Sequence, residues 1–555
     1  MASTCIQSAE SSGPVRVHSD VKPVVSTEEE KSEDRVQSDV DSNAVTQEPR
    51  HDGSSAAPVL RRFDKYLRKY TLCSVLASVS AWCFGFDTGS IGPITIMPQF
   101  IDHYDLHSPT IQGLVVSSIL ITASLSSLAA GPLADRFSRT RTAALGGAVF
   151  CAGSILAAAA SNLAMLFVGR CIAGVGEGLF LSSAMVYLLE IAPTSLRGRL
   201  SCTQQLFVTL GLAAGYFVSY GTVDIPSSLS YRLLFILQAL VSGTYAVIML
   251  FLPHSPRWLQ HVGRTEESAK AWERLGYSTA EAEKEQEVEQ RERNEEEAAT
   301  NARRQDGSTF AMLFSKEIRK RTVLGVFLMA MQQACGIDGV LYYAPVLFKQ
   351  AGLSSNTASF LASGVSGLLN VVLTIFTQIF TDNWGRRASM INGGVVIAGS
   401  MLTIGTLYAS GATDEAAGRW AVIVLIYIFV VAFAMSWAVV NRIYCSEIQP
   451  MATRAAATSL GQCANWVVNW IIAFSTPLFL AKSSSGPYFL FGTCAALTVV
   501  VCILFQPESR GVSLESLDSI FAVSPWRNML SKASARARRL EPAIPLRPLS
   551  SDVGA

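Results

Sequence analysis

The sequence predicts an all-α membrane protein of twelve transmembrane helices, arranged as two repeats of six. Three observations support this fold class. Half of the 555 residues are hydrophobic, only 16% are charged, and the mean hydropathy is +0.33. A soluble domain carries roughly a quarter charged residues, and here the charge gathers in a few segments between long apolar runs. Short motifs also recur, in the same order, in the two halves of the chain.

Twelve apolar runs are long enough to cross a membrane, which takes roughly 20 residues. Gly and Pro within them are compatible with membrane helices, because neighbouring helices satisfy the freed backbone groups. A soluble protein could not bury so many runs in its core. The predicted spans are 69–93, 111–131, 143–160, 163–190, 203–222, 232–252, 322–350, 358–380, 388–410, 420–446, 456–481 and 487–505.

Polar segments divide the chain into five predicted parts. Residues 1–65 are rich in Ser, Glu, Val and Asp and contain no apolar run, so we expect a disordered cytoplasmic tail. Two six-helix bundles, 66–253 and 322–506, flank a highly charged segment, 254–321, that is expected to form a cytoplasmic helical linker. Residues 507–555 form the second predicted tail.

Arginines follow the even-numbered predicted helices, whereas the loops after odd-numbered helices, such as 94–110 and 351–357, are poor in Arg. The positive-inside rule therefore places both termini and the linker in the cytoplasm. The arginines that follow even-numbered helices include Arg136, Arg139, Arg141, Arg197, Arg199, Arg257, Arg264, Arg386, Arg387 and Arg454.

Three motifs of the first half recur in the second half. GFD at 85–87 recurs as GID at 336–338, and DRFSR at 135–139 recurs as DNWGRR at 382–387. EIAPTSLR at 190–197 recurs as EIQPMATR at 447–454. Three recurrences in one order indicate duplication of a six-helix unit. Parallel six-helix repeats are typical of one large class of secondary transporters.

These residues resemble the major facilitator superfamily, and within it the sugar porters of fungal type. GPLADRFSR follows the second predicted helix, VGRCIAGVGEG opens the fourth, and YLLEIAPTSLRGR closes it. PHSPRWL ends the sixth helix, QQACGIDGVLYY lies in the seventh, NWVVN lies in the eleventh, and PESRGVSLE follows the twelfth. The resemblance covers essentially all of 65–525 and implies the major facilitator fold.

Charged residues at the cytoplasmic helix ends match the inner gate of that family. Several partly solvated ion pairs, each worth about 1 kcal/mol, would hold this end closed and still release it. Simple anchoring by arginine would need no acids, yet acids recur at repeated positions. The predicted cytoplasmic gate is Asp135, Arg139, Glu190, Arg197, Asp382, Arg386, Arg387, Glu447 and Arg454. His254 stands where the family usually has Glu.

Asp87 in the first helix and Arg170 in the fourth match the proton relay of proton-coupled sugar porters. A charge at a helix centre costs on the order of 3 kcal/mol on insertion scales, so such residues mark function. The resemblance implies that Asp87 accepts the proton and that Arg170 tunes it; a static salt bridge is the alternative. Glu177 lies seven residues after Arg170 on the same helical face and replaces an apolar residue of the family.

Amide side chains match the sugar site of the family. Amides offer both donors and acceptors to hydroxyl groups, although each of them alone could serve as an interhelical hydrogen bond. Tyr342 and Tyr343 match the aromatic pair of the outer gate. The predicted substrate-binding amides are Gln205, Gln332, Gln333, Asn370, Asn465 and Asn469.

Two further substrate-site candidates depart from the family pattern. Asp338 replaces the usual Asn of helix 7, and the tenth helix carries Val439 and Arg442 in place of its usual Pro and Trp. The two charges either pair with each other, which leaves a neutral site, or Arg442 binds a substrate carboxylate through its planar guanidinium.

The resemblance and the retained Asp87 and Arg170 predict a secondary active transporter that carries a sugar or polyol by proton symport with alternating access. The alternative is a transporter or exporter of an acidic sugar-like or specialised metabolite on the same fold. A non-transporting nutrient sensor is disfavoured because the C-terminal tail is short. We expect a multi-pass monomer of the plasma membrane whose partners are a small-molecule substrate, protons and the lipid bilayer.

Several other classes of protein are disfavoured. A net charge of +1 argues against a nucleic-acid partner. No Walker or GxSxG motif occurs in a suitable context, so an enzyme is not expected. The eleven cysteines form no CxxC pair or Cys/His cluster, so neither a metal site nor a cofactor is expected.

Overall fold

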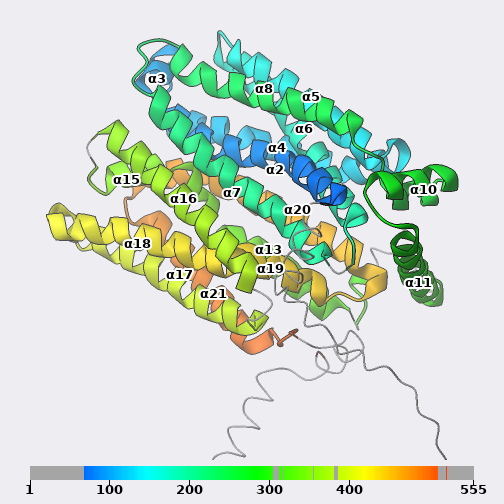
Figure 1. Ribbon diagram of the computed structural model, residues 1–555. Helices are drawn as coiled ribbons and strands as arrows, with labels where there is room; N and C mark the ends of the chain where they lie inside the picture. The colour runs from blue at the N-terminus through cyan, green and yellow to red at the C-terminus, as the bar shows by residue number, and fades with distance from the viewer. Residues whose placement is uncertain are drawn as a thin grey trace, which may run out of the picture. The chain divides into compact units, whose positions relative to one another are not determined.

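The computed structural model describes residues 68–194, 196–303, 312–316, 318–353, 355–380, 385–510 and Phe521. All regular elements within these residues are helices, as predicted (Figure 1). The predicted N-terminal tail, the gate residue Asp382 and most of the predicted C-terminal tail lie outside the described residues.

The first bundle contains the six predicted spans of the N-terminal half and one short helix. Its helices are α2 (Lys69–Ile96), α3 (Pro98–Tyr104), α4 (Pro109–Phe137), α5 (Arg139–Ala158), α6 (Leu163–Ile191), α7 (Arg197–Thr222) and α8 (Leu229–Phe251). The segment after them forms α9 (Pro256–His261), α10 (Thr265–Arg274) and α11 (Thr279–Arg303).

The second bundle repeats this plan, with two of its spans interrupted. Its elements are α13 (Arg319–Ala334), α14 (Ile337–Tyr342), α15 (Ala344–Gln350), α16 (Asn356–Phe380), α17 (Arg386–Ala409), the 3₁₀ turn η3 (Ala412–Asp414), α18 (Ala416–Met435), α19 (Trp437–Glu447), α20 (Met451–Lys482) and α21 (Gly486–Phe505).

Within the described residues, 11 helices are long and apolar enough to cross a membrane. They correspond to the predicted spans, with the exception of the fifth. That span lies on α7, a 26-residue helix that carries two arginines and consecutive glutamines in its first half. These polar residues lower the hydropathy of α7. The helix nevertheless packs against α2 of the first bundle and against α16 of the second bundle.

The seventh span is broken at Gly336, between α13 and α14. Gly336 has φ +87°, a left-handed conformation that side chains other than glycine rarely adopt. A Cβ at this position would also lie 2.3 Å from the ring of Phe491. The break sets Asp338 in the first turn of α14.

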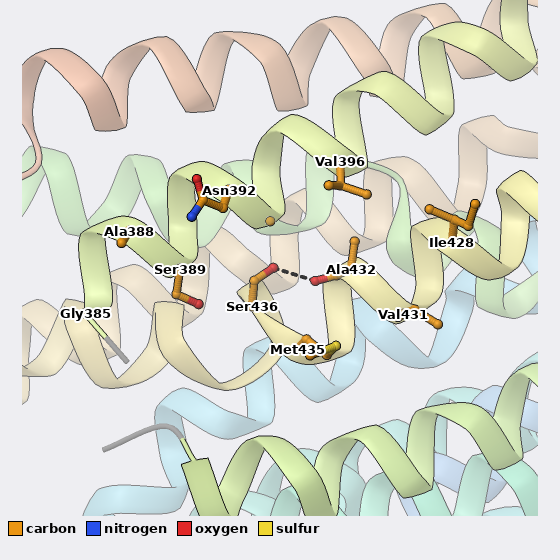
Figure 2. Close-up of a pocket in the computed structure, with 11 residues that line it drawn as sticks. Gly385, Ala388, Ser389, Asn392, Val396, Ile428, Val431, Ala432, Met435 and Ser436 are labelled. Atoms are coloured by element: carbon orange, nitrogen blue, oxygen red, sulfur yellow. Dashed lines mark hydrogen bonds between the residues drawn. The ribbon is translucent and has the colours of Figure 1, made fainter. Parts of the chain in front are cut away.

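The tenth span is broken at Ser436, between α18 and α19, although it lacks the proline that usually loosens this helix. Ser436 has φ −129° and ψ −78°, and its Oγ donates to the carbonyl of Ala432 at 2.5 Å (Figure 2). A hydroxyl that bonds back four residues in this way often bends a helix. Gly393 of α17 admits the bend, because a Cβ there would lie 2.0 Å from the Ser436 Oγ.

Small residues allow the helices of the first bundle to approach closely. A Cβ on Gly153 of α5 would lie 2.6 Å from the carbonyl oxygen of Gly169 on α6. Membrane helices associate largely through such close packing, because lipid provides no hydrophobic driving force between them.

The two bundles meet along two pairs of helices. α7 lies beside α16, and α4 packs against α20 (Figure 1). The first pair is joined by the amide of Gln378, which donates to the carbonyl of Cys202 at 2.6 Å. In the second pair, a Cβ on Gly113 would lie 2.4 Å from the carbonyl oxygen of Phe474.

The helices α10 and α11 attach to the ends of α2 and α6. The hydroxyl of Tyr277 donates to the carbonyl of Ile191 at 2.9 Å, and Arg68 pairs with Glu281 at 2.7 Å. Trp258 of α9 donates to the carbonyl of Asp135, at the end of α4, at 2.8 Å. We call this end of the helices, which carries Arg139 and Arg386, the basic end.

Candidate functional site

Asp87 and Arg170 form a buried, two-pronged ion pair between α2 and α6. Arg170 Nη1 donates to Asp87 Oδ1 at 3.0 Å, and Nη2 donates to Oδ2 at 3.2 Å. The two side chains are 4% and 2% exposed. Charge-assisted pairs with this geometry are among the stronger hydrogen bonds in proteins, so the structure brings together the two residues predicted to form the proton relay.

Two further groups, neither of them predicted from the sequence, complete this pair. Gln238 of α8, which is buried, donates from Nε2 to Asp87 Oδ1 at 3.0 Å. Arg170 Nη2 also donates to the carbonyl of Val116 on α4 at 3.2 Å. The charge state of Asp87 therefore bears on the packing of four helices: α2, α4, α6 and α8.

Three of the predicted substrate-binding amides form one buried network between α13 and α20. Asn465 Nδ2 donates to Gln332 Oε1 at 3.2 Å, and Gln333 Nε2 donates to Asn465 Oδ1 at 3.3 Å. Gln332 Nε2 donates to the carbonyl of Trp437 at 2.7 Å, across the break in the tenth span. The network therefore positions α19 against α13 and α20.

Two acceptor oxygens of this region have no protein partner among the described residues. They are Gln333 Oε1 and Asn469 Oδ1, and both are buried. A hydroxyl of a bound polyol could donate to either of them. Of the remaining predicted amides, Gln205 is half-buried on α7, and Asn370 on α16 accepts a long 3.5 Å bond from Thr374.

Asp338 and Arg442 are held apart. They lie close enough to interact electrostatically, but within the described residues no ion pair of 4.0 Å or less joins them. Asp338 is half-buried, and Arg442 is exposed although α19 packs among α13, α17, α18 and α20.

The predicted outer-gate tyrosines lie where the seventh span meets the first. Tyr342 and Tyr343 are both buried, and the Tyr343 hydroxyl donates to the carbonyl of Ala473 at 2.8 Å. A Cβ on Gly92 of α2 would lie 1.4 Å from the carbonyl oxygen of Tyr342. The two helices therefore touch at backbone distance, near the end of α2 that lies opposite the basic end.

At the basic end of the first bundle, Arg139 joins two predicted gate acids. Arg139 Nε pairs with Glu190 Oε1 at 2.9 Å, and its Nη1 pairs with Asp135 Oδ1 at 2.9 Å. His254 Nδ1 lies 2.9 Å from the Ser138 hydroxyl and 2.8 Å from that of Thr140. His254 therefore contacts the start of α5.

The second bundle repeats the arrangement. Arg386 Nη2 pairs with Glu447 Oε1 at 3.3 Å, as Arg139 pairs with Glu190. Glu508 accepts from the backbone amides of Arg386 and Arg387 at 2.7 and 3.1 Å, so its carboxylate caps the start of α17. Ser509 Oγ donates to Glu447 Oε2 at 2.7 Å.

The described pairs of the gate join helices within one bundle, so they brace each half. Of the other predicted gate residues, Arg454 donates to the carbonyl of Gln449 at 3.3 Å, and Arg197 is half-buried at the start of α7. Glu508 was not among the predicted gate residues. The available signal was a fourth recurrence, since Pro253-His254-Ser255 and Pro507-Glu508-Ser509 occupy corresponding places after the last span of each half.

A groove of about 670 Å³ lies between α17 and α18 (Figure 2). Its walls are mostly apolar, and Ser389, Asn392 and Ser436 supply polar groups. No predicted substrate residue lines it. Within the described residues, no group of His, Cys, Asp and Glu could hold a metal ion, and the cysteines there are free thiols.

Relatives of this chain are transporters. Over 449 residues it is 32% identical to the glucose transporter GlcP of Staphylococcus epidermidis, covering 80% of this chain and 96% of that protein. Over 460 residues it is 31% identical to the arabinose-proton symporter of Bacillus subtilis, covering 81% and 94%.

The fold is similar to that of the xylose transporter XylE from E. coli in its inward open conformation. The TM-score is 0.67 at 23% sequence identity, with 81% of this chain and 99% of that chain covered. This likeness supports the predicted twelve-helix, two-repeat architecture. Residues 72–521 match the family described as sugar (and other) transporter. The chain is therefore a multi-pass membrane protein of the sugar transporter family within the major facilitator superfamily, a family of transporters and not of enzymes.

Proposed function

We propose that this protein carries a sugar or polyol across the membrane by proton symport with alternating access. The observation that carries this proposal is the sealed Asp87–Arg170 pair, which also engages α4 and α8. Its relative in Bacillus subtilis is an arabinose-proton symporter. The basic end faces the cytoplasm in this proposal, in keeping with the positive-inside rule.

Protonation of Asp87 would change the contacts of four helices at once. A neutral carboxyl group attracts Arg170 far less than a carboxylate does, so the hydrogen bonds from the two guanidinium nitrogens and from the Gln238 amide to Asp87 would weaken. The carboxylate and the proton would then act as a switch on the packing of the first bundle.

Alternating access is supported by the different states of the two ends. Near the end opposite the basic end, α2 and α14 touch at Gly92 and Tyr342. Arg442 is exposed on α19, whose last residue, Glu447, lies at the basic end. In this proposal, such a conformation would be closed on the outer side and would leave Arg442 open toward the cytoplasmic side.

Purified protein in liposomes tests the proposal. With an inward proton gradient we expect uphill uptake of a neutral member of a panel of glucose, xylose, myo-inositol, galacturonate and quinate, and a protonophore should abolish it. Asp87→Asn should lose accumulation and keep exchange, whereas Asp224→Asn, an exposed loop acid, should accumulate normally. Uphill uptake that survives in Asp87→Asn would refute the proton-relay assignment.

A second candidate function is transport of an acidic sugar-like molecule. The exposed Arg442, which no carboxylate within the described residues contacts at ion-pair distance, favours it. Its planar guanidinium suits a carboxylate. Uptake of galacturonate or quinate alone, abolished by Arg442→Gln, would support this candidate, and neutral uptake that is insensitive to Arg442→Gln would eliminate it.

A further inference from the structure

Glu177 is a buried acid that the coupling pair does not use. It lies on α6, seven residues after Arg170, and is 1% exposed. Seven residues make two helical turns, so Glu177 lies on the Arg170 face and about 10 Å closer to the basic end. Neither of its carboxyl oxygens has a hydrogen-bond partner in the described part of the chain.

The helices around α6 direct Glu177 toward α2. On either side of it, Gly174 and Gly178 face α4 so closely that an added Cβ would lie 2.1 Å from the hydroxyls of Thr122 and Ser126, respectively. Gly176 faces α5 at a similar distance, 2.4 Å from the amide nitrogen of Phe150.

The ionisable groups that interact with Glu177 come from three helices. They are Arg170 on α6, Asp87 and Cys83 on α2, and Tyr342 on α14. Arg170 is the cation among them, and its carboxylate partner is Asp87. Two buried acids, Asp87 and Glu177, therefore lie in the electrostatic field of one arginine.

The energetics of burial decide how this cluster is charged. An ionised carboxylate without donors is far too unfavourable in an apolar environment, and such a group takes up a proton. Arg170 and Gln238 donate hydrogen bonds to Asp87, whereas no donor among the described residues reaches Glu177. With a neutral Glu177 the cluster of two acids and one arginine has no net charge, which a membrane interior favours.

We propose that Glu177 is a second proton-binding carboxyl of the coupling site, and that Glu177 and Asp87 share one proton with Arg170 as their common counter-ion. During inward transport the proton would leave the Asp87 carboxyl group and bind the Glu177 carboxylate, so the negative charge moves to Asp87. Arg170 would have a donor left for Glu177, because its Nε is buried with no hydrogen-bond partner among the described residues. Glu177 then extends the proton path along α6 toward the basic end.

The proposal rests on the proposed proton symport, but its first test does not require a substrate. Infrared spectra of the purified protein at neutral pH should contain the C=O stretch of a buried carboxylic acid. Glu177→Gln should remove this band, whereas Glu415→Gln, an exposed acid, should leave it. A band that Glu177→Gln does not change, or no band at all, would overturn the proposal.

The second test is transport in the liposome assay. Glu177→Gln keeps the shape of a neutral acid but cannot bind or release a titratable proton, so uphill accumulation should fall at least tenfold while exchange continues. Glu177→Asp should restore part of the accumulation. Full accumulation by Glu177→Gln, with an unchanged pH profile, would assign Glu177 a packing role and leave the proton-symport proposal standing. The proton-symport proposal itself fails if the protonophore leaves uphill uptake by the wild type unchanged.

Discussion

The two halves of the chain place an acid at corresponding positions, but they treat it differently. Asp87 lies in an uninterrupted helix, sealed from solvent and bound on both oxygens by Arg170. Asp338 follows a break at Gly336, is half-buried, and has its arginine, Arg442, beyond ion-pair distance. The first half therefore neutralises its buried charge internally, whereas the second half leaves its charges accessible.

In the proposed proton symport, this difference would separate two tasks that the transporter must combine. A proton site benefits from a sealed pair, because protonation then changes many contacts at once. A substrate site requires groups that are open to solvent until the substrate binds. We infer that duplication of one six-helix unit allowed the same position to serve both purposes.

The largest effect is expected from Arg170→Leu. It leaves the Asp87 carboxylate buried without its cation, and breaking a buried pair in this way costs about 3–5 kcal/mol. Arg442→Leu is the matched change in the second half and should cost less than about 1 kcal/mol, because Arg442 is exposed and forms no close ion pair with any residue that the structure describes. Chemical unfolding in detergent micelles measures both.

The double variant Asp87→Asn with Arg170→Leu sharpens this comparison. Replacing the unpaired Asp87 carboxylate by a neutral amide should recover part of the stability that Arg170→Leu loses. Equal losses for Arg170→Leu and Arg442→Leu would mean that the two halves do not differ as described.

An intermediate effect is expected from Asn465→Leu. The substitution removes donors to Gln332 and to the carbonyl of Met329, and it leaves buried groups unpaired, at a cost of about 1–3 kcal/mol. Asn370→Leu, which loses a single long bond to Thr374, should cost less. If both variants unfold alike, the network around Asn465 does not stabilise the second half.

The smallest effect is expected on the pH dependence of stability, through His254, which follows the last span of the first half. Burial, with nearby Arg141 and Arg264, holds the pKa of His254 below its ordinary value, and Glu267 opposes this. The folded protein therefore binds this proton less readily than the unfolded chain, so stability should fall as the pH drops below about 6.5 and through the pKa of the folded state.

Thermal melting from pH 8 to pH 5 measures this effect. In His254→Gln the melting temperature should fall less between pH 8 and pH 5 than in the wild type. Arg141→Gln should reduce this fall by a smaller amount. Parallel curves for the wild type and His254→Gln would show that the acid sensitivity has another origin.

Most of the fold could be predicted, because the membrane imposes long apolar runs. The breaks at Gly336 and Ser436 could not, since both depend on neighbours distant in sequence, Phe491 and Gly393. A proline would have revealed the second break, but a serine that bonds back to its own helix does the same with no clear sequence signal.

The candidate site was predicted unevenly for a similar reason. Asp87 and Arg170 stand out as charges within apolar spans, whereas Gln238 is a neutral amide in a long helix, and only the structure brings it to Asp87. Sequence spacing also could not decide whether Asp338 and Arg442 pair, because their contact depends on how two broken helices are oriented.

The Glu508 cap has a consequence for biosynthesis. It joins the start of α17 to a residue made 122 positions later, so the ribosome releases α17 long before its cap exists. In the first half, residues 254–258 reach the ends of α4 and α5 before any span of the second half is translated. A chain that stops at Gln506 would contain all the spans. It would lack Glu508, the carboxylate that binds the first two backbone amides of the ninth span.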